Sequence, residues 1–155
     1  MSRPAGNSQT LDPAQLQLLT AIQDRLIPRE GDMPGAGEIG GAEVVAGYLR
    51  ERPALHRDIT AALDAVEATS GGPAPFGNLA DDDKDAVLRQ VEADLPDEFE
   101  TLWRQTYNSY YTNTAIQERL GAGALPPQPH GYVMPAFDET RLDAVKKRDK
   151  LWRDA

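Results

Sequence analysis

Between Phe99 and Tyr132 the chain passes from an aromatic helix to a proline-rich strip, and this change limits the folds that it can adopt. Residues 99–110 repeat apolar and aromatic side chains at spacings of three and four, as one face of a helix does. The segment Pro126-Pro127-Gln128-Pro129 favours an extended backbone that cannot continue a helix. We therefore expect a helical domain followed by a polyproline-like arm, which suits adhesion to a larger partner.

Apolar residues also recur at helical spacing elsewhere in the chain, and no segment alternates as a strand does. We expect helices at about 13–27, 41–52, 55–69, 81–95, 97–110 and 114–120, and from Asp138 to the C-terminus. The predicted fold is all-α: a flexible N-terminus (1–10), an irregular helical bundle (11–121), a Pro-rich arm (122–137) and a C-terminal helix (138–155).

Two helix boundaries have clear capping signals. Asp12 precedes Pro13 and lies three residues before Gln15, which predicts a capping box with proline at the first helical position. Thr112 or Asn113 is expected to cap the short helix that follows the aromatic one. Gly121 is expected to end that helix in the left-handed conformation.

Two groups of side chains are expected to pack the bundle. They are Val44, Val45, Tyr48 and Leu49 on the second helix, and Phe99, Trp103 and Tyr107 on the aromatic helix. Tyr111 lies off the apolar stripe, so we expect it to orient the proline arm instead.

Composition excludes several classes of protein. The net charge of −9 argues against nucleic-acid binding, and the absence of cysteine excludes disulfides and thiol chemistry within this chain. No apolar run is long enough to insert into a membrane. The first residues contain no apolar signal segment. A cytoplasmic location is therefore expected, or a periplasmic one if a leader was removed or another chain carries the signal.

Residues for catalysis are scarce. His56 and His130 are far apart in the sequence and form no metal-binding motif. The acidic run 81–85 lacks the glycine and glutamate of a calcium loop, and the glycines of 35–41 follow no predicted strand. We expect no catalytic, cofactor-binding or metal-binding residue in this chain, and the least favoured function is that of a small enzyme in its own right.

Three motifs in order resemble the gluconate 2-dehydrogenase subunit 3 family. They are the opening helix with its IP end, the PGA-x-E-x-G turn, and the pattern YYTN…LG…PPQPHGY, together covering Leu11 to Tyr132. The resemblance implies a small accessory subunit of an FAD-dependent oxidoreductase complex. In this family a large subunit of the glucose–methanol–choline (GMC) type binds FAD and oxidises a sugar, sugar acid or glycoside, and a cytochrome subunit often accepts the electrons. Many relatives carry a twin-arginine leader on the small subunit, which this chain lacks.

The residues expected to bind the partner lie at the end of the aromatic helix and beyond it. They are Tyr111, Pro126, Pro127, Pro129, His130, Tyr132 and Trp152. His130 either bonds locally or enters the mouth of the partner's active site. The basic C-terminal helix either folds back on the acidic fourth helix or, as we favour, reaches the partner. The alternative function is a free-standing helical adaptor or maturation chaperone that releases its client.

Overall fold

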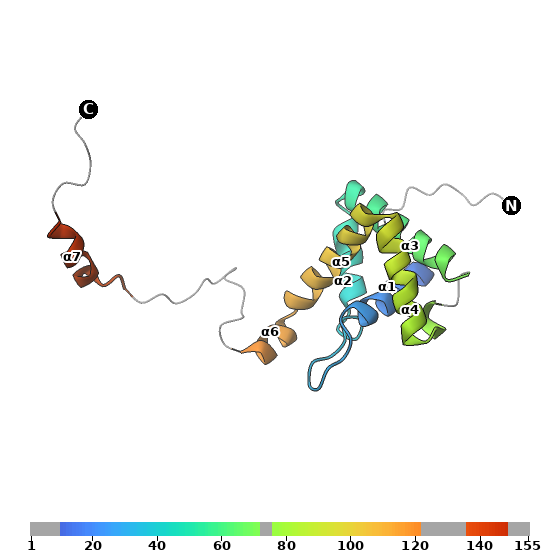
Figure 1. Ribbon diagram of the computed structural model, residues 1–155, viewed down its shortest axis with the longest axis horizontal. Helices are drawn as coiled ribbons and strands as arrows, with labels where there is room; N and C mark the ends of the chain where they lie inside the picture. The colour runs from blue at the N-terminus through green and yellow to red at the C-terminus, as the bar shows by residue number, and fades with distance from the viewer. Residues whose placement is uncertain (1–9, 72–75, 122–135, 149–155) are drawn as a thin grey trace, which may run out of the picture. The chain divides into compact units, whose positions relative to one another are not determined.

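The computed structural model describes residues 10–71, 76–121 and 136–148 (Figure 1). The chain divides into two compact units, Met1–Leu125 and Pro126–Ala155. The described part of the first unit consists of helices, with one isolated bridge between Glu30 and Met33, so the all-α prediction is confirmed. The helices are α1 (Pro13–Leu26), α2 (Gly41–Leu49), α3 (Pro53–Thr69), α4 (Asp81–Asp94), α5 (Pro96–Tyr111) and α6 (Thr114–Leu120), with a short 3₁₀ helix at Phe76–Asn78.

The helix boundaries follow the capping residues. The amide of Gln15 donates to Asp12 Oδ1 at 2.9 Å and the amide of Asp12 donates to Gln15 Oε1 at 3.1 Å, which forms the predicted capping box. Of the two candidates for α6, Asn113 is the cap, because its Oδ1 accepts from the Ala115 amide at 2.9 Å. Gly121 ends α6 as predicted and has a positive φ of 107°, but its ψ of 170° lies outside the left-handed helical conformation. A residue with this φ favours glycine.

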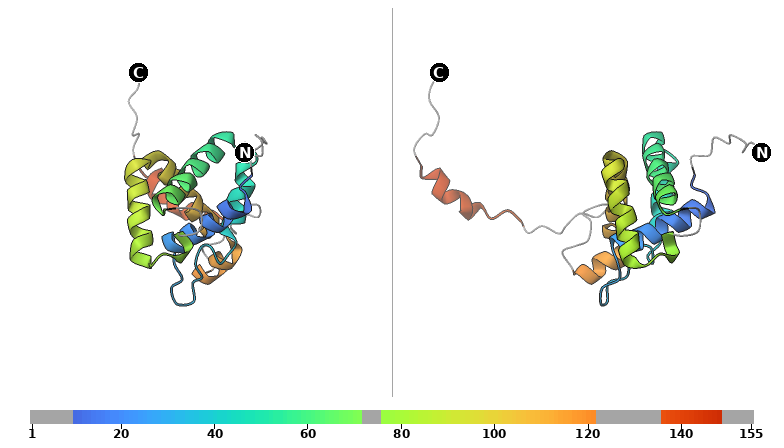
Figure 2. Two further views of the ribbon diagram at one scale, coloured as in Figure 1. Left: turned by 90° about the vertical axis from the view of Figure 1, so that its right-hand side faces the viewer. Right: turned by 45° about the vertical axis from the view of Figure 1, so that its right-hand side comes forward.

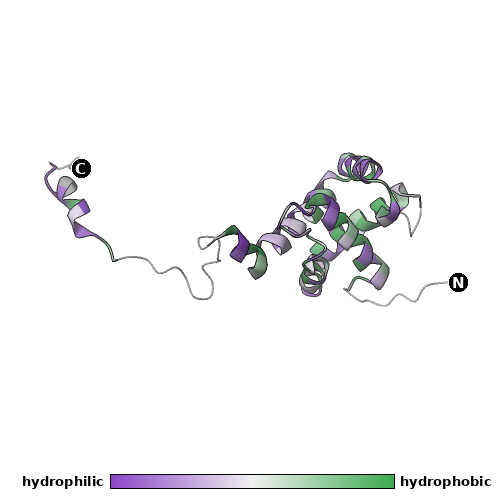
Figure 3. Cartoon of the chain, turned by 90° about the horizontal axis from the view of Figure 1, so that it is seen from below, coloured by the Kyte–Doolittle hydropathy of each residue, from purple (hydrophilic) through white to green (hydrophobic). Residues whose placement is uncertain are grey.

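The core lies where α5 contacts α2, α3 and α4, and α1 runs crosswise against the same helices (Figure 2). Figure 3 shows apolar and hydrophilic residues alternating along the helices, as amphipathic helices require. Leu19 and Ile22 of α1, Leu63 of α3 and Leu102 of α5 are buried in one cluster. These four side chains come from three helices, so burial of their apolar surface holds the bundle together.

Four side chains predicted to be in the core lie at the surface or only partly inside it. Val44 and Tyr48 are exposed because α2 buries its other apolar face, which includes Val45 and Leu49. The guanidinium of Arg52 lies 5.6 Å from the centre of the Tyr48 ring and partly covers it. Trp103 is also exposed, so its prediction is wrong, and Tyr107 is half-buried.

An ion pair joins α1 to the acidic start of α4. Arg25 contacts Asp85 at 2.5 Å and Asp81 at 3.3 Å. The hydrogen bond from Arg25 lowers the pKa of the Asp85 carboxyl. Because the folded-state pKa is depressed, the stability that this pair contributes is present above the unfolded-state pKa. It is lost as the pH falls through the lowered value.

The second unit contains a 3₁₀ helix at Glu139–Leu142 followed by α7 (Asp143–Lys146). The predicted start at Asp138 is confirmed, since its Oδ1 accepts from the Thr140 amide at 3.0 Å. The rest of the predicted C-terminal helix, after Arg148, lies outside the described residues. How the basic residues of this segment are used therefore stays a prediction.

Candidate partner interface

A row of three aromatic side chains lies along one flank of α5. Trp103, Tyr107 and Tyr111 are four residues apart, and their ring centres lie 4.6 Å and then 5.9 Å from one another. The exposed fraction is 42% for Trp103 and 46% for Tyr111. The row is exposed because α5 buries the neighbouring face, which carries Phe99, Leu102, Thr106, Ser109 and Tyr110. We call these three residues the aromatic row.

Sequence reasoning found only one member of this row. Tyr111 was placed off the apolar stripe, and its exposure agrees with that placement. Trp103 was missed because a tryptophan four residues after Phe99 fits the spacing of a buried face. The signal that could have found it is the run Leu102, Thr106 and Ser109, which completes a buried face without Trp103.

Tyr110 connects α5 to the loop between α1 and α2. Its ring is buried, and its hydroxyl donates a hydrogen bond to the backbone oxygen of Pro34 at 2.9 Å. Burial raises the pKa of the Tyr110 hydroxyl, which therefore stays protonated and able to donate. The ring also meets Tyr111 edge to face, with 5.1 Å between centres. Tyr111, at the C-terminal end of the aromatic row, therefore packs against a tyrosine that is bonded to the loop.

Hydrogen bonds and an ion pair stabilise the loop at 27–40, which Figure 1 shows as a hairpin extending from the helices. The Gly37 amide donates to Asp24 Oδ1 at 2.8 Å, and the Gly35 amide donates to Glu38 Oε1 at 3.2 Å. Arg29 forms an ion pair with Glu38, and its hydrogen bond lowers the pKa of that carboxyl. These bonds join the two arms of the loop to one another and join the loop to α1.

The loop packs on the end of α5 and on α6 through a second, smaller apolar cluster. Ala36, Tyr110 and Ile116 are buried in it, with Met33 and Ile39 packed against them. The side chain of Arg119 on α6 donates to the backbone oxygen of Asp32 near the loop tip. The cluster therefore packs the loop and α6 against Tyr110, which lies next to Tyr111 at the C-terminal end of the aromatic row.

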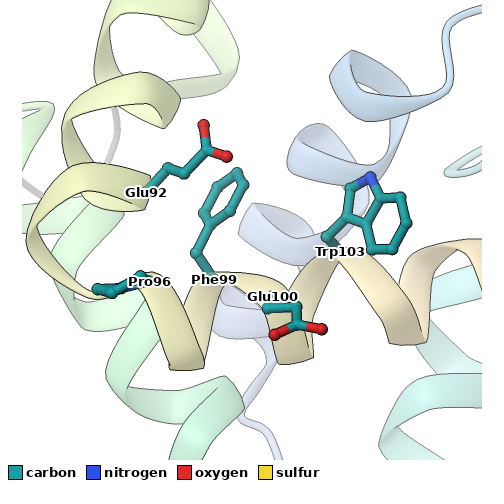
Figure 4. Close-up of a pocket in the computed structure, with 5 residues that line it drawn as sticks. All are labelled: Glu92, Pro96, Phe99, Glu100 and Trp103. Carbon is teal, nitrogen blue, oxygen red and sulfur yellow. The ribbon is translucent and has the colours of Figure 1, made fainter.

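A groove with a volume of about 260 Å³ opens beside Trp103, the first residue of the aromatic row. Its lining residues are Glu92, Pro96, Phe99, Glu100 and Trp103. Figure 4 shows the Phe99 ring and the Trp103 indole rising side by side from α5, with the Glu92 carboxylate next to the Phe99 ring. The groove is therefore lined by two aromatic and two glutamate side chains, together with Pro96.

Gln23 is a buried polar residue whose side-chain amide atoms both lack hydrogen-bond partners among the described residues. Its side chain is fully buried in α1. The nearby Ser109 hydroxyl donates to the Thr106 backbone oxygen instead. An unpaired buried amide costs free energy, typically about 1–3 kcal/mol.

Gln23→Met is expected to raise the melting temperature. Methionine has nearly the shape of glutamine and removes both unpaired polar atoms, so the free energy of unfolding should increase by about 1 kcal/mol. Thermal unfolding followed by circular dichroism measures it. The matched control is Gln17→Met at an exposed position of α1, which should leave the melting temperature nearly unchanged. A lower melting temperature for Gln23→Met would mean that the amide is bonded in solution.

Two structural features are absent from the described part of the chain. No group of three or more His, Asp or Glu side chains there could hold a metal ion. None of the described helices combines the length and the apolar character needed to cross a membrane. Of the predicted partner-binding residues, Tyr111 lies in the aromatic row. The others lie outside the described residues and stay predictions: Pro126, Pro127, Pro129, His130, Tyr132 and Trp152.

The fold and this surface define an all-α domain with an exposed aromatic face on α5. Residues 13–122 match the model of a family described as gluconate 2-dehydrogenase subunit 3. The match spans most of the chain, so the protein belongs to the gluconate 2-dehydrogenase subunit 3 family, and the resemblance seen in the sequence is confirmed. No curated protein and no solved structure matches the chain.

Proposed function

We propose that this chain is a non-catalytic small subunit that binds and stabilises a large FAD-dependent oxidoreductase subunit of the GMC type. The family name describes one subunit of a multi-subunit dehydrogenase, which supports a role within a complex. The observation that carries the proposal is the aromatic row of Trp103, Tyr107 and Tyr111. A monomeric helical domain gains no core stability from exposing these rings to water.

The composition of the row fits an interface. Tryptophan and tyrosine are enriched among the residues that contribute most to binding energy between proteins. Their rings offer a large contact area with few rotatable bonds, so little conformational entropy is lost on docking. The Tyr111 end of the row packs on Tyr110, which is buried in the second apolar cluster. A preformed surface of this kind binds with a small reorganisation cost.

The chemistry belongs to the partner in this proposal. FAD is expected in the large subunit, where a sugar, sugar acid or glycoside is oxidised, and in this family a cytochrome subunit often accepts the electrons. This chain contributes contact area and the stabilisation of its partner by mass action.

Co-expression with the large subunit tests the proposal. The two chains are expected to elute together in a one-to-one complex whose flavin absorbance follows both chains. The chain expressed alone should be colourless. The large subunit expressed alone should have a lower melting temperature than in the complex, because binding stabilises the folded state. Size-exclusion chromatography with absorbance at the flavin wavelengths and calorimetry measure these properties.

Two results would contradict the proposal. Flavin absorbance that follows the isolated small chain would show that this chain, and not the large subunit, holds the cofactor. A small chain that is needed for maturation but absent from the mature flavoprotein would support the alternative, a chaperone that releases its client.

A further inference from the structure

The groove beside Trp103 has an unusual combination of side chains for a surface hollow. Its lining includes the buried Phe99 ring and the exposed Trp103 indole, with the Glu92 carboxylate next to the Phe99 ring and Glu100 between the two aromatic residues in the sequence (Figure 4). Tyr107 packs against Trp103 with 4.6 Å between ring centres, so the indole is braced from the side away from Phe99. The groove is continuous with the aromatic row, because Trp103 belongs to both.

The charge around the groove is mainly negative, although Arg104 contacts Glu100 and offsets part of it. The chain from Glu92 to Glu100 contains no basic residue, and its acidic residues are Glu92, Asp94, Asp97, Glu98 and Glu100. Asp97 and Glu98 complement the positive end of the α5 dipole, and Glu100 pairs with Arg104 one turn later. Within the described part of the chain, no basic side chain pairs with Glu92. The local field therefore favours a cationic occupant.

The same features argue against a small anionic ligand. A sugar acid carries a carboxylate, which Glu92 and Glu100 would repel. The groove also lacks the convergent hydrogen-bond donors that orient a small polar substrate. An arginine or lysine side chain fits both parts of the groove, because its alkyl stem packs on apolar rings while its charged end stays near carboxylates. A cation over the face of tryptophan gains a further electrostatic attraction.

Resting on the proposed function, we propose that this groove receives an arginine or lysine side chain from an exposed segment of the large flavoprotein subunit. The alkyl stem lies between Phe99 and Trp103, and the cation meets Glu92 and Glu100. The contact extends the aromatic-row interface to the start of α5 and sets the position of the partner along this helix. It makes part of the binding affinity sensitive to salt.

The test measures the affinity of the purified small chain for the large subunit at about 50 mM and about 500 mM salt. The double variant Glu92→Gln, Glu100→Gln should weaken binding at least about tenfold at low salt and reduce the salt dependence. Trp103→Ala should weaken binding by about tenfold or more at both salt concentrations. The matched control is Glu51→Gln, an exposed residue outside the groove, which should leave the affinity unchanged. All these positions are exposed, and melting curves verify that each variant folds.

Four other outcomes overturn the proposal. An intact wild-type complex whose affinity is insensitive to all groove variants would leave the proposed function standing and remove the groove from the interface. Loss of affinity with Trp103→Ala alone would show that the occupant is uncharged. Self-association weakened by the groove variants would assign the groove to a second copy of this chain. Failure of the wild-type chains to bind one another would overturn the proposed function together with this inference.

Discussion

Gly37→Ala is expected to destabilise the first unit strongly, although it adds only one methyl group. A Cβ at Gly37 would lie 2.6 Å from the backbone oxygen of Thr20 and 2.6 Å from Asp24 Oδ2. Because Thr20 belongs to α1, its backbone cannot move aside without shifting the helix. The loop must then separate from α1 and lose the hydrogen bond from the Gly37 amide to Asp24. We expect the free energy of unfolding to fall by about 1–3 kcal/mol, measured by urea denaturation.

Gly47→Ala is the matched control for this glycine substitution. Gly47 lies inside α2, and a Cβ there would meet no atom within 4 Å. Alanine favours a helix over glycine by about 0.5–1 kcal/mol, so this variant should be more stable than the wild type. If Gly37→Ala were also stabilising, the close packing of the loop on Asp24 would not exist in solution.

The positions of the helices could be predicted from the sequence because their signals are local. Proline at the first helical position starts α1, α3 and α5, and the α1 capping box lies within four residues. The choice of buried face could not be predicted as well. The α2 sequence offers two apolar faces, one with Val45 and Leu49 and one with Val44 and Tyr48. Which face is buried depends on where α1 and α5 lie, and the spacing within α2 does not contain that information.

The contacts that support the candidate interface were also hidden in the sequence. The glycines of 35–41 predict a turn, but nothing near them in the sequence indicates that Asp24 accepts a hydrogen bond from the Gly37 amide. A Cβ at Gly35 would likewise lie 2.4 Å from Asp24 Oδ1, which gives a physical reason for glycine at both positions. The bond from Tyr110 to Pro34 joins residues far apart in the chain. Such pairs become visible only when the tertiary structure brings them together.

Leu102 and Trp103 are neighbours on α5, but Leu102→Ala and Trp103→Ala are expected to affect different properties. Leu102→Ala should mainly lower stability, and Trp103→Ala should mainly weaken binding. Leu102 is fully buried in the main apolar cluster, whereas Trp103 is 42% exposed. Removing the Leu102 side chain leaves a cavity among packed helices, so the free energy of unfolding should fall by about 2–5 kcal/mol. Trp103→Ala creates no interior cavity and should change that free energy by about 1 kcal/mol or less. Denaturant titrations of the isolated small chain measure both values.

Binding to the large subunit should show the reverse order. At a temperature and protein concentration at which both variants are folded, Leu102→Ala should bind with nearly the wild-type affinity per folded molecule. Trp103→Ala should bind weakly, because it removes the residue shared by the groove and the aromatic row. Leu120→Ala on α6 serves as the size-matched control, since that leucine is 52% exposed and should contribute little to stability. Equal stability losses for Leu102→Ala and Leu120→Ala would contradict the burial of Leu102. Wild-type affinity for Trp103→Ala would contradict the assignment of Trp103 as a main contributor to binding, because truncating such a residue costs binding energy.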